Sequence, residues 1–81
     1  MHSLQIEEIA ERFLKKIQKK DADMILKKLY SIRENPFPHL KKLKGSKLWR
    51  LRVLKYRAIL DIIVSGRKII VLRIGYRKNV Y

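Results

Sequence analysis

Residues 47–76, KLWRLRVLKYRAILDIIVSGRKIIVLRIGY, carry a hydrophobic period of two, which replaces the helical pattern of the chain before Gly45. At the start of this stretch Trp49 and Leu51 alternate with Arg50 and Arg52, so apolar and basic side chains fall on opposite faces of a strand. This pattern predicts a sheet that packs one face against a core and leaves the other face basic.

Two more strands follow within the same stretch. Residues 56–64 are apolar and β-branched on nearly both faces, as expected of a central strand, and residues 68–75 form another apolar run. Ser65 and Gly66 between them are typical of a tight hairpin turn. Because the connections are short, we expect neighbouring strands to be antiparallel.

Upstream of the strands, apolar residues recur at the spacing of two amphipathic helices. We expect Asp21 or Asp23 to cap the second helix, which must end near Asn35 because residues before prolines leave the helical region. A connection of only a few residues makes the two helices an antiparallel hairpin. The apolar stripes are Ile6, Ile9, Ala10, Phe13 and Ile17, then Ala22, Ile25, Leu26, Leu29 and Ile32.

The chain is therefore predicted to be a single α+β domain, residues 1–81, in which an N-terminal helical hairpin packs on a three- to four-stranded antiparallel sheet. Its parts are the hairpin at about 5–34, a linker at 35–46, the sheet at 47–76 and a C-terminal tail at 77–81. The expected core comprises Ile9, Phe13, Ile17, Ile25, Leu29, Leu51, Ile62 and Leu72.

The charge of the chain is high and unevenly distributed. Its 81 residues include 21 Lys and Arg but only 7 Asp and Glu, which gives a formal net charge of +14. Residues 1–40 carry +2, whereas residues 41–81 carry +12 with Asp61 as their only acid. A surface of one sign repels itself, so the second half predicts a polyanion or an acidic protein as partner. The alternative is a solvated basic face.

The composition also limits the compartment. There is no cysteine, so neither a disulfide framework nor a thiolate metal site is available. No apolar run approaches the ~20 residues of a membrane-spanning helix, and the start MHSLQIEE lacks the features of a secretory signal. We expect a cytoplasmic protein without a membrane partner.

Few residues offer familiar catalytic chemistry. Neither histidine has an acidic cluster beside it, no Gly-rich phosphate loop is present, and Asp61 is too isolated for catalysis by paired carboxylates. Antiparallel pairing can place Arg50, Arg57 and Arg77 on one surface, where guanidinium groups bind phosphates and stabilise a phosphoryl transition state. This pattern leaves binding and cleavage both open, and a solvated sheet face is the plain alternative.

Three segments of the chain resemble the RelE/ParE toxin superfamily, and its RelE-like archaeal members most. They are NPFPHLKKLKGSKLWRLRVLKYRAILDI at 35–62, KIIVLRIG at 68–75 and YRKNVY at 76–81. The resemblance implies the toxin of a type II toxin–antitoxin pair, which enters the ribosomal A site and cleaves mRNA without a metal, by attack of a 2′-hydroxyl on the adjacent phosphate. It also implies contact with rRNA and inhibition by an acidic, RelB-like antitoxin.

The same resemblance implies roles for single residues. Arg57 would contact the scissile phosphate, Arg77 would act as general acid or charge stabiliser, and Tyr81 would act as general base. Arg50 would steady the phosphate. The expected RNA- or phosphate-binding set is Lys44, Lys47, Arg50, Arg52 and Arg73, and no metal or cofactor is expected.

The chain departs from the family pattern in three places. Leu48 occupies a position where the family has a lysine, Leu54 and Lys55 replace a glycine before the central Tyr-Arg, and the family's first strand could only be residues 1–6. Two other functions therefore stay open. One is a ParE-like inhibitor of DNA gyrase, which shares the fold without needing the arginine–tyrosine set. The other is a non-catalytic RNA-binding protein or decayed toxin.

Overall fold

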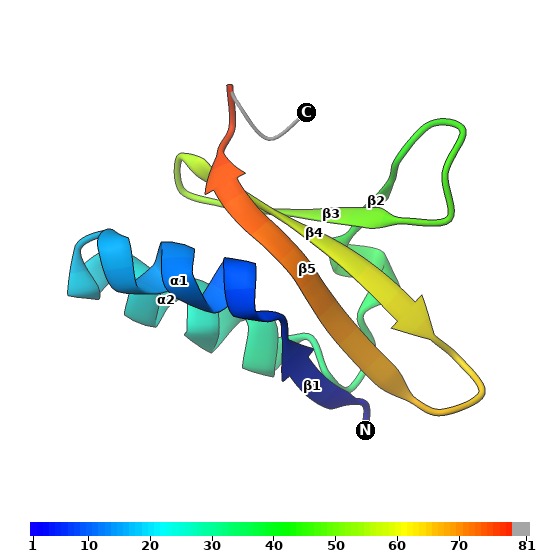
Figure 1. Ribbon diagram of the computed structural model, residues 1–81. Helices are drawn as coiled ribbons and strands as arrows, with labels where there is room; N and C mark the ends of the chain where they lie inside the picture. The colour runs from blue at the N-terminus through cyan, green and yellow to red at the C-terminus, as the bar shows by residue number, and fades with distance from the viewer. Residues whose placement is uncertain (79–81) are drawn as a thin grey trace.

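The computed structural model describes residues 1–78, which form two α-helices and a five-stranded sheet (Figure 1). Both helices lie on one side of the sheet, which confirms the predicted α+β class. In chain order the elements are β1 (Ser3–Ile6), α1 (Glu8–Lys16), α2 (Lys19–Ser31), the 3-10 helix η1 (Phe37–His39), β2 (Lys41–Lys42), β3 (Trp49–Val53), β4 (Tyr56–Ile63) and β5 (Lys68–Tyr76).

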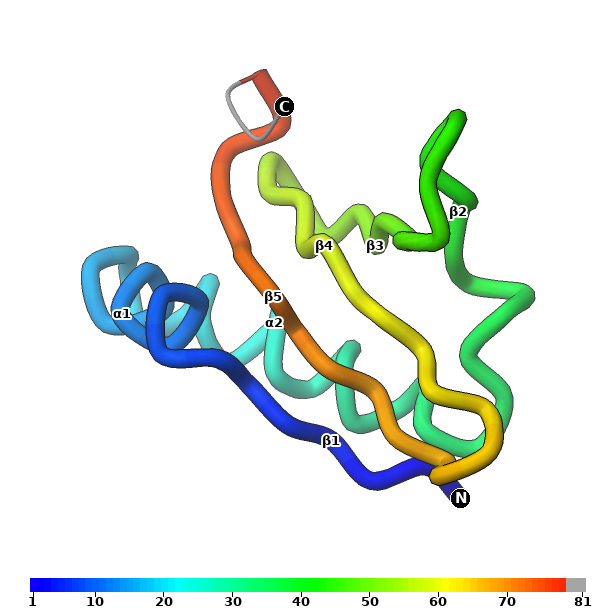
Figure 2. The backbone as a smooth tube through the Cα atoms, turned by 45° about the vertical axis from the view of Figure 1, so that its right-hand side comes forward, coloured from blue at the N-terminus to red at the C-terminus, as the bar shows by residue number. Residues whose placement is uncertain are grey.

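The sheet is mixed and has the strand order β1-β5-β4-β3-β2, so it has more strands than the three or four predicted, and one pair is parallel. β1 pairs parallel with β5, beginning with Ser3 opposite Lys68, whereas the other pairs are antiparallel (Figure 2). Backbone hydrogen bonds from Ser3 N to Arg67 O (2.8 Å) and from Glu7 N to Val71 O (3.0 Å) extend this ladder at both ends. The weak strand propensity of HSLQI is thus overcome by pairing with β5.

α1 begins at Glu8, later than predicted, because Ile6 belongs to β1. Acidic side chains lie in its first turn and lysines in its last turn, which complements the helix dipole. Ala10 and Leu14 are buried, whereas Ile9 is 59% exposed. The prediction of Ile9 as a core residue was wrong, because the face of α1 that packs on the sheet runs through Ala10 and Leu14.

α2 packs on the sheet through side chains that include Ile25 and Leu29, as predicted. Its N-cap residue is Gln18, without a side-chain capping hydrogen bond, so the prediction that Asp21 or Asp23 caps this helix was wrong. Asp21 instead lies in the first turn of α2, where its carboxylate accepts a hydrogen bond from the sheet.

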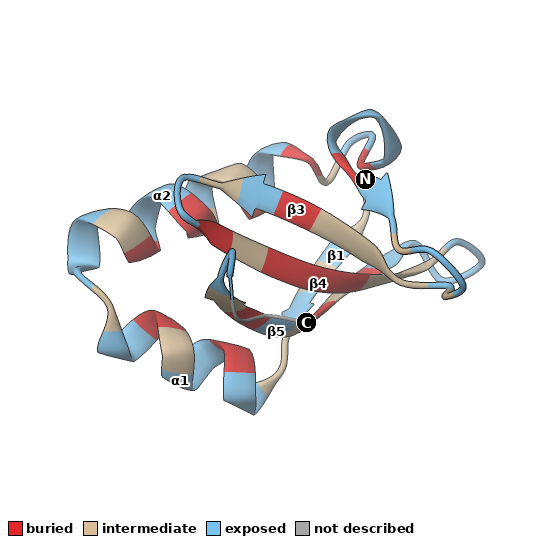
Figure 3. Ribbon diagram, turned by 90° about the horizontal axis from the view of Figure 1, so that it is seen from above, coloured by how far each residue is buried: buried red, intermediate tan, exposed pale blue. Residues whose placement is uncertain are grey.

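The core lies between the helices and the inner face of the sheet, where the central parts of β3, β4 and β5 are buried (Figure 3). Leu51 and Leu60 are at most 1% exposed. Phe13, Ile17 and Ile62, which were predicted as core residues, are partly buried and pack against the edge of this cluster.

A β-bulge in β5 explains why Leu72 is only partly buried and the prediction of it as a core residue was wrong. Ile59 of β4 lies opposite Arg73, whereas the next residue, Leu60, lies opposite Val71, so Leu72 is the extra residue. The bulge shifts the alternation of β5 by one position. Arg73 is thereby turned to the face of the sheet away from the helices.

The segment predicted as a linker, 35–46, contains structure of its own. Besides η1, it includes β2, where Lys41 pairs with Arg50 and Lys42 pairs with Trp49. Gly45 in the following loop has a φ of 72°, a conformation that favours glycine. Within residues 1–78, no helix is both long and apolar enough to cross a membrane.

Candidate functional site

The sheet face that the helices leave uncovered, called the free face below, is strongly basic. In β3, Trp49 and Leu51 pack toward the helices, so the pleat turns Arg50 and Arg52 to the free face. In β4 the same alternation turns Arg57 to this face, next to the buried Tyr56. The period of two thus produces the basic face that the sequence predicted.

The strand register aligns these side chains in two rows across the sheet. The first row is Lys41, Arg50, Ile59 and Arg73, and the second row is Arg52, Arg57 and Gly75. Side chains directly opposite each other have Cβ atoms about 4.5–5.5 Å apart, and like charges in such pairs destabilise a sheet. The pairing of Arg52 with Arg57 is therefore an arrangement that a bound anion would stabilise.

Ile59 is a buried residue of the free face, between two arginines of the first row. It lies on the free face, outside the core cluster beneath the helices, yet only 5% of it is exposed. Its cross-strand partners are Arg50 and Arg73, whose aliphatic stems can cover it. The Nε atoms of Arg50 and Arg57 are themselves buried. Both arginines are thus partly buried against the sheet.

Two predicted phosphate-binding residues lie outside these rows. The Nζ atom of Lys47 is 3.6 Å from Oδ2 of Asp61, the one acid of the second half of the chain. Lys44 is exposed in the loop between β2 and β3, and Leu48, at the family's lysine position, directly precedes β3. The structure therefore brings together the arginines of the predicted set but neither lysine.

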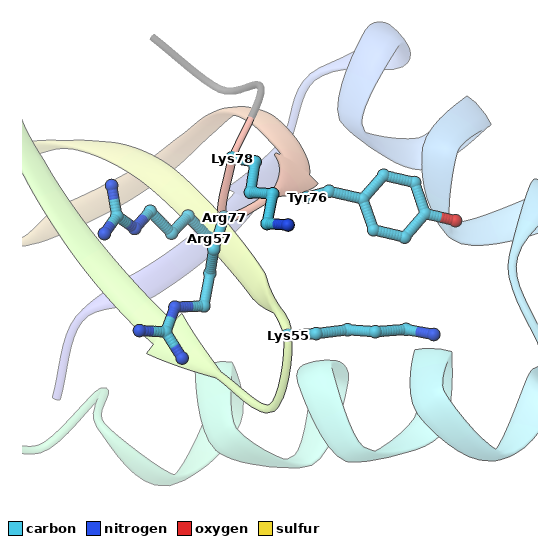
Figure 4. Close-up of a pocket in the computed structure, with 5 residues that line it drawn as sticks. All are labelled: Lys55, Arg57, Tyr76, Arg77 and Lys78. Atoms are coloured by element: carbon cyan, nitrogen blue, oxygen red, sulfur yellow. The ribbon is translucent and has the colours of Figure 1, made fainter.

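A pocket of about 600 Å³ lies at the end of the sheet where the β3–β4 turn meets the end of β5 (Figure 4). The Arg77 N–H donates a hydrogen bond to the carbonyl of Lys55 (2.9 Å), which joins the two segments. In Figure 4, Arg57 and Arg77 extend to one side of the strands, whereas Lys55 and Tyr76 extend to the other. The lining residues are Lys55, Arg57, Tyr76, Arg77 and Lys78.

Three aromatic rings support the Tyr76 side of this pocket. Phe13 of α1 meets Tyr56 and Tyr76 edge-on, with centroid distances of 5.9 and 5.5 Å, and the two tyrosine rings are 5.4 Å apart. The Nζ atom of Lys55 lies 5.8 Å from the Tyr56 centroid and 5.9 Å from the Tyr76 centroid. The pocket thus combines cations with an aromatic surface.

Tyr56 is anchored to the helices and does not act in the pocket as a base. Its hydroxyl donates a hydrogen bond of 2.6 Å to Oδ2 of Asp21. This hydrogen bond, together with burial and the negative charge of Asp21, raises the pKa of Tyr56 to about 12. Tyr56 therefore stays protonated at neutral pH and serves to fix β4 against α2.

A second, smaller cavity of about 200 Å³ lies on the other side of β3. Three residues of the free face, Lys41, Arg50 and Arg52, contribute to its wall, and its other basic residues come from α2 and η1. The lining residues are Lys28, His39, Lys41, Arg50, Leu51 and Arg52. The basic surface therefore continues from the main pocket across β3 to the sheet edge.

The sequence-based prediction missed Lys55, Tyr76 and Lys78 as pocket residues. Their positions in the chain could have indicated them. Lys55 lies in a hairpin turn and Tyr76 ends the strand that pairs beside this hairpin, so the turn and the strand end must meet at one end of the sheet. The proposed general base Tyr81 lies outside the described residues. Among residues 1–78 no group of three or more His, Cys, Asp or Glu side chains could hold a metal ion.

Comparison with protein families shows what kind of protein carries this face. The family model described as the ParE toxin of the type II toxin–antitoxin system, parDE, matches residues 4–81. The chain belongs to this ParE toxin family. The resemblance to the RelE/ParE toxin superfamily that the sequence segments indicated is thereby confirmed. No curated protein matches the chain in sequence.

Solved structures with the fold of this ParE-family chain include several RelE toxins. The toxin–antitoxin complex RelBE2 from Mycobacterium tuberculosis matches with a TM-score of 0.87 and 18% identity, over 94% of this chain and 98% of that one. The archaeal RelE–RelB complex from Pyrococcus horikoshii matches with a TM-score of 0.84 and 21% identity, over 98% of both chains. The intact RelBE complex of E. coli matches with a TM-score of 0.79 and 21% identity, over 94% and 96%. At these identities the likeness shows the fold.

Proposed function

We propose that this protein is a toxin that stops translation by cleaving mRNA in the ribosomal A site, in contact with rRNA. The observation that carries the proposal is the alignment of Arg50, Arg52, Arg57 and Arg73 on the free face, beside the pocket that Arg77 lines. Guanidinium groups bind phosphate oxygens in bidentate fashion, and a set of them on one rigid sheet suits a polyanionic backbone.

The proposed reaction is an intramolecular transfer within the RNA and requires no metal. The 2′-oxygen of one nucleotide bonds to the adjacent phosphorus, and the bond from that phosphorus to the 5′-oxygen of the next nucleotide breaks. A base removes the 2′ proton and an acid protonates the leaving oxygen, which yields a cyclic phosphate end and a 5′-hydroxyl end. Arg50 and Arg57 stabilise the charge that develops on the non-bridging oxygens.

The proton-transfer roles are carried over from the family resemblance. Arg77 is proposed to stabilise the leaving oxygen or protonate it, and Tyr81 is proposed to act as general base. The cationic side chains that line the pocket would stabilise the phenolate form of a nearby tyrosine, and a phenolate can accept a proton as a general base does.

The proposed inhibitor is an acidic, RelB-like antitoxin. The M. tuberculosis, P. horikoshii and E. coli structures are all toxin–antitoxin complexes, and the present chain carries a net charge of +14. An acidic partner that covers the free face would neutralise the repulsion between its arginines and block access to the pocket.

The first test is expression of the toxin in cells with protein synthesis and mRNA integrity followed together. We expect arrest of translation, with Arg57→Ala and Arg77→Ala each lowering the cleavage rate on purified ribosomes by about 10²-fold or more. Lys27→Ala on the exposed surface of α2 is the matched control and should remain toxic. An mRNA with a 2′-deoxy nucleotide before the scissile phosphate should resist cleavage.

A gyrase inhibitor is the second candidate, because the matching family model is that of the ParE toxin. The two candidates differ in the first cellular change after induction. A fall in DNA supercoiling while mRNA stays intact and translation continues would favour the gyrase reading. RNA binding without cleavage, with Arg57→Ala weakening only the binding, would identify a non-catalytic protein. This alternative is kept because Leu48 occupies the position where the family has a lysine.

A further inference from the structure

We infer that the Tyr76 side of the pocket is a base-stacking subsite for single-stranded RNA, which holds the nucleobase adjoining the phosphate bound by Arg57 and Arg77. The inference rests on the proposed function, because it assumes that RNA lies on the free face. It assigns the pocket to a nucleotide, with the phosphate on one side of the strands and the base on the other.

The ring of Tyr76 is both accessible and held in place. It is 43% exposed at the mouth of the pocket, although it belongs to a strand. Phe13 contacts it edge-on at 5.5 Å and Tyr56 lies beside it at 5.4 Å, with the two tyrosine rings inclined by 34°. The Tyr56 hydroxyl is itself hydrogen-bonded to Asp21, so the ring beside Tyr76 is anchored to α2. A base would gain a stacking surface without having to order it first.

Lys55 lies over the Tyr76 ring in the free protein. Its Nζ atom lies 5.9 Å from the Tyr76 centroid, within the range of a cation–π contact, and the lysine side chain is exposed. A base that stacks on Tyr76 would displace this ammonium group. The freed lysine remains within the pocket, on the Tyr76 side to which Lys78 also extends (Figure 4).

The arrangement of the pocket around the strand end fits a nucleotide better than a lone anion. Arg57 and Arg77 extend to one side and Tyr76 to the other (Figure 4), while the Arg77 to Lys55 hydrogen bond fixes the two segments. A phosphate alone would need only the arginine side. The phosphate and the base of a nucleotide lie at opposite ends of its sugar. The phosphate can therefore contact the arginines while the base contacts Tyr76 on the other side of the same strand end.

The test measures binding of a short, labelled single-stranded RNA to the full chain by fluorescence anisotropy at constant salt. Tyr76→Leu, which keeps an apolar group against Phe13 but removes the ring, should raise the Kd by about 5- to 150-fold. Tyr76→Phe should bind as the wild type does, because the stacking surface remains. Tyr30→Leu is the matched control, because Tyr30 is an exposed tyrosine of α2 whose ring centroid lies 4.9 Å from the guanidinium carbon of Arg33. Its substitution should leave the Kd unchanged.

An abasic scan makes the assignment specific to a base. With one base removed at each position in turn, a single position should weaken wild-type binding as much as Tyr76→Leu weakens binding of intact RNA. At that position Tyr76→Leu should cause no further loss. If no abasic position weakens wild-type binding, the inference is overturned, and this arm does not depend on whether Tyr76→Leu folds.

Arg57→Ala separates the inference from the proposed function. If Arg57→Ala weakens binding while folded Tyr76→Leu binds intact RNA as tightly as the wild type, the stacking subsite is wrong and the arginine site stands. If neither variant weakens binding, both the subsite and the proposed RNA site on the free face are wrong.

Discussion

Tyr56 and Arg57 are adjacent in the chain, yet the pleat of β4 turns their side chains to opposite faces of the sheet. The Tyr56 hydroxyl reaches Asp21 on α2, whereas Arg57 lies on the free face in line with Arg52. Substitution of Tyr56 should therefore disturb the packing of α2 on the sheet, while substitution of Arg57 should change the charge of the proposed site. The two effects are separable by measuring stability and activity in the same variants.

The Tyr56 to Asp21 hydrogen bond predicts an unusual alkaline titration. Because the carboxylate favours the neutral phenol, the pKa of Tyr56 is about 12, and Asp21→Asn should return it toward the ordinary tyrosine value of ~10. Absorbance at 295 nm between pH 8 and 12.5 measures this change, and Tyr56→Phe identifies the transition. An Asp21→Asn variant with unchanged titration would contradict the assignment.

The effect of this pKa on stability has a definite sign. An unfolded tyrosine loses its proton near pH ~10, whereas Tyr56 in the folded chain keeps its proton up to about pH 12. The stabilisation from the neutral, hydrogen-bonded phenol is therefore fully present below pH ~10. It declines as pH rises from there to about 12, since only the unfolded state releases its proton in that interval.

At the scale of elements, the turn between β3 and β4 contains backbone strain. Val53 pairs with Tyr56, which leaves only Leu54 and Lys55 in the turn, and Leu54 has a φ of 55°. The left-handed region is unfavourable for a residue with a Cβ atom. The turn stays closed all the same, because strand pairing on both sides fixes its ends.

Leu54→Gly should stabilise the domain by roughly 0.5–1 kcal/mol, since relief of left-handed strain exceeds the added backbone entropy. Leu54 is 47% exposed, so little apolar burial is lost. The free energy of unfolding from urea titration measures the effect. Val64→Gly is the control, because Val64 is also an exposed turn residue but lacks a positive φ, and it should be neutral or destabilising. Equal shifts in both variants would exclude strain as the cause.

An element could be predicted from the sequence where local interactions form it, and could not where it depends on residues far along the chain. The alternation of Trp49, Arg50, Leu51 and Arg52 is a local signal, and it correctly predicted β3 and its basic face. The bulge at Leu72 depends on register against another strand, which no local pattern in β5 records. β1 likewise depends on pairing with a strand far along the chain.

At the scale of the whole molecule, charge is segregated between the two layers. The first forty residues, which include both helices, carry +2, and the remaining half, which contains β2 to β5, carries +12. The arginines of the proposed site could be predicted because alternation places them on one face. The pocket could not, because Lys55 and Tyr76 meet only when the β3–β4 turn is brought against the end of β5.

The segregated charge predicts strongly salt-dependent RNA binding. For single strands, log K falls with log salt by about 0.7 for each phosphate neutralised, so Arg52→Ala should reduce the magnitude of the slope by about 0.7. Lys27→Ala, which removes an equal charge from α2, should leave the slope unchanged. Kd values measured across a salt series test this. Equal changes in the two variants would mean that net charge, rather than the free face, governs binding.

The position of β5 in the sheet also sets the order in which this protein can fold during its own synthesis. β5 is made after the other strands but lies between β1 and β4, and its pairing of Ser3 with Lys68 spans 65 residues. Before residues 68–76 emerge from the ribosome, β1 has no partner strand and α1 lacks β5, the strand on which it mainly packs. Such long-range pairing is slow to form. The nascent chain therefore remains without a complete core until β5 emerges, so the basic face is assembled only after residues 68–76 have been made.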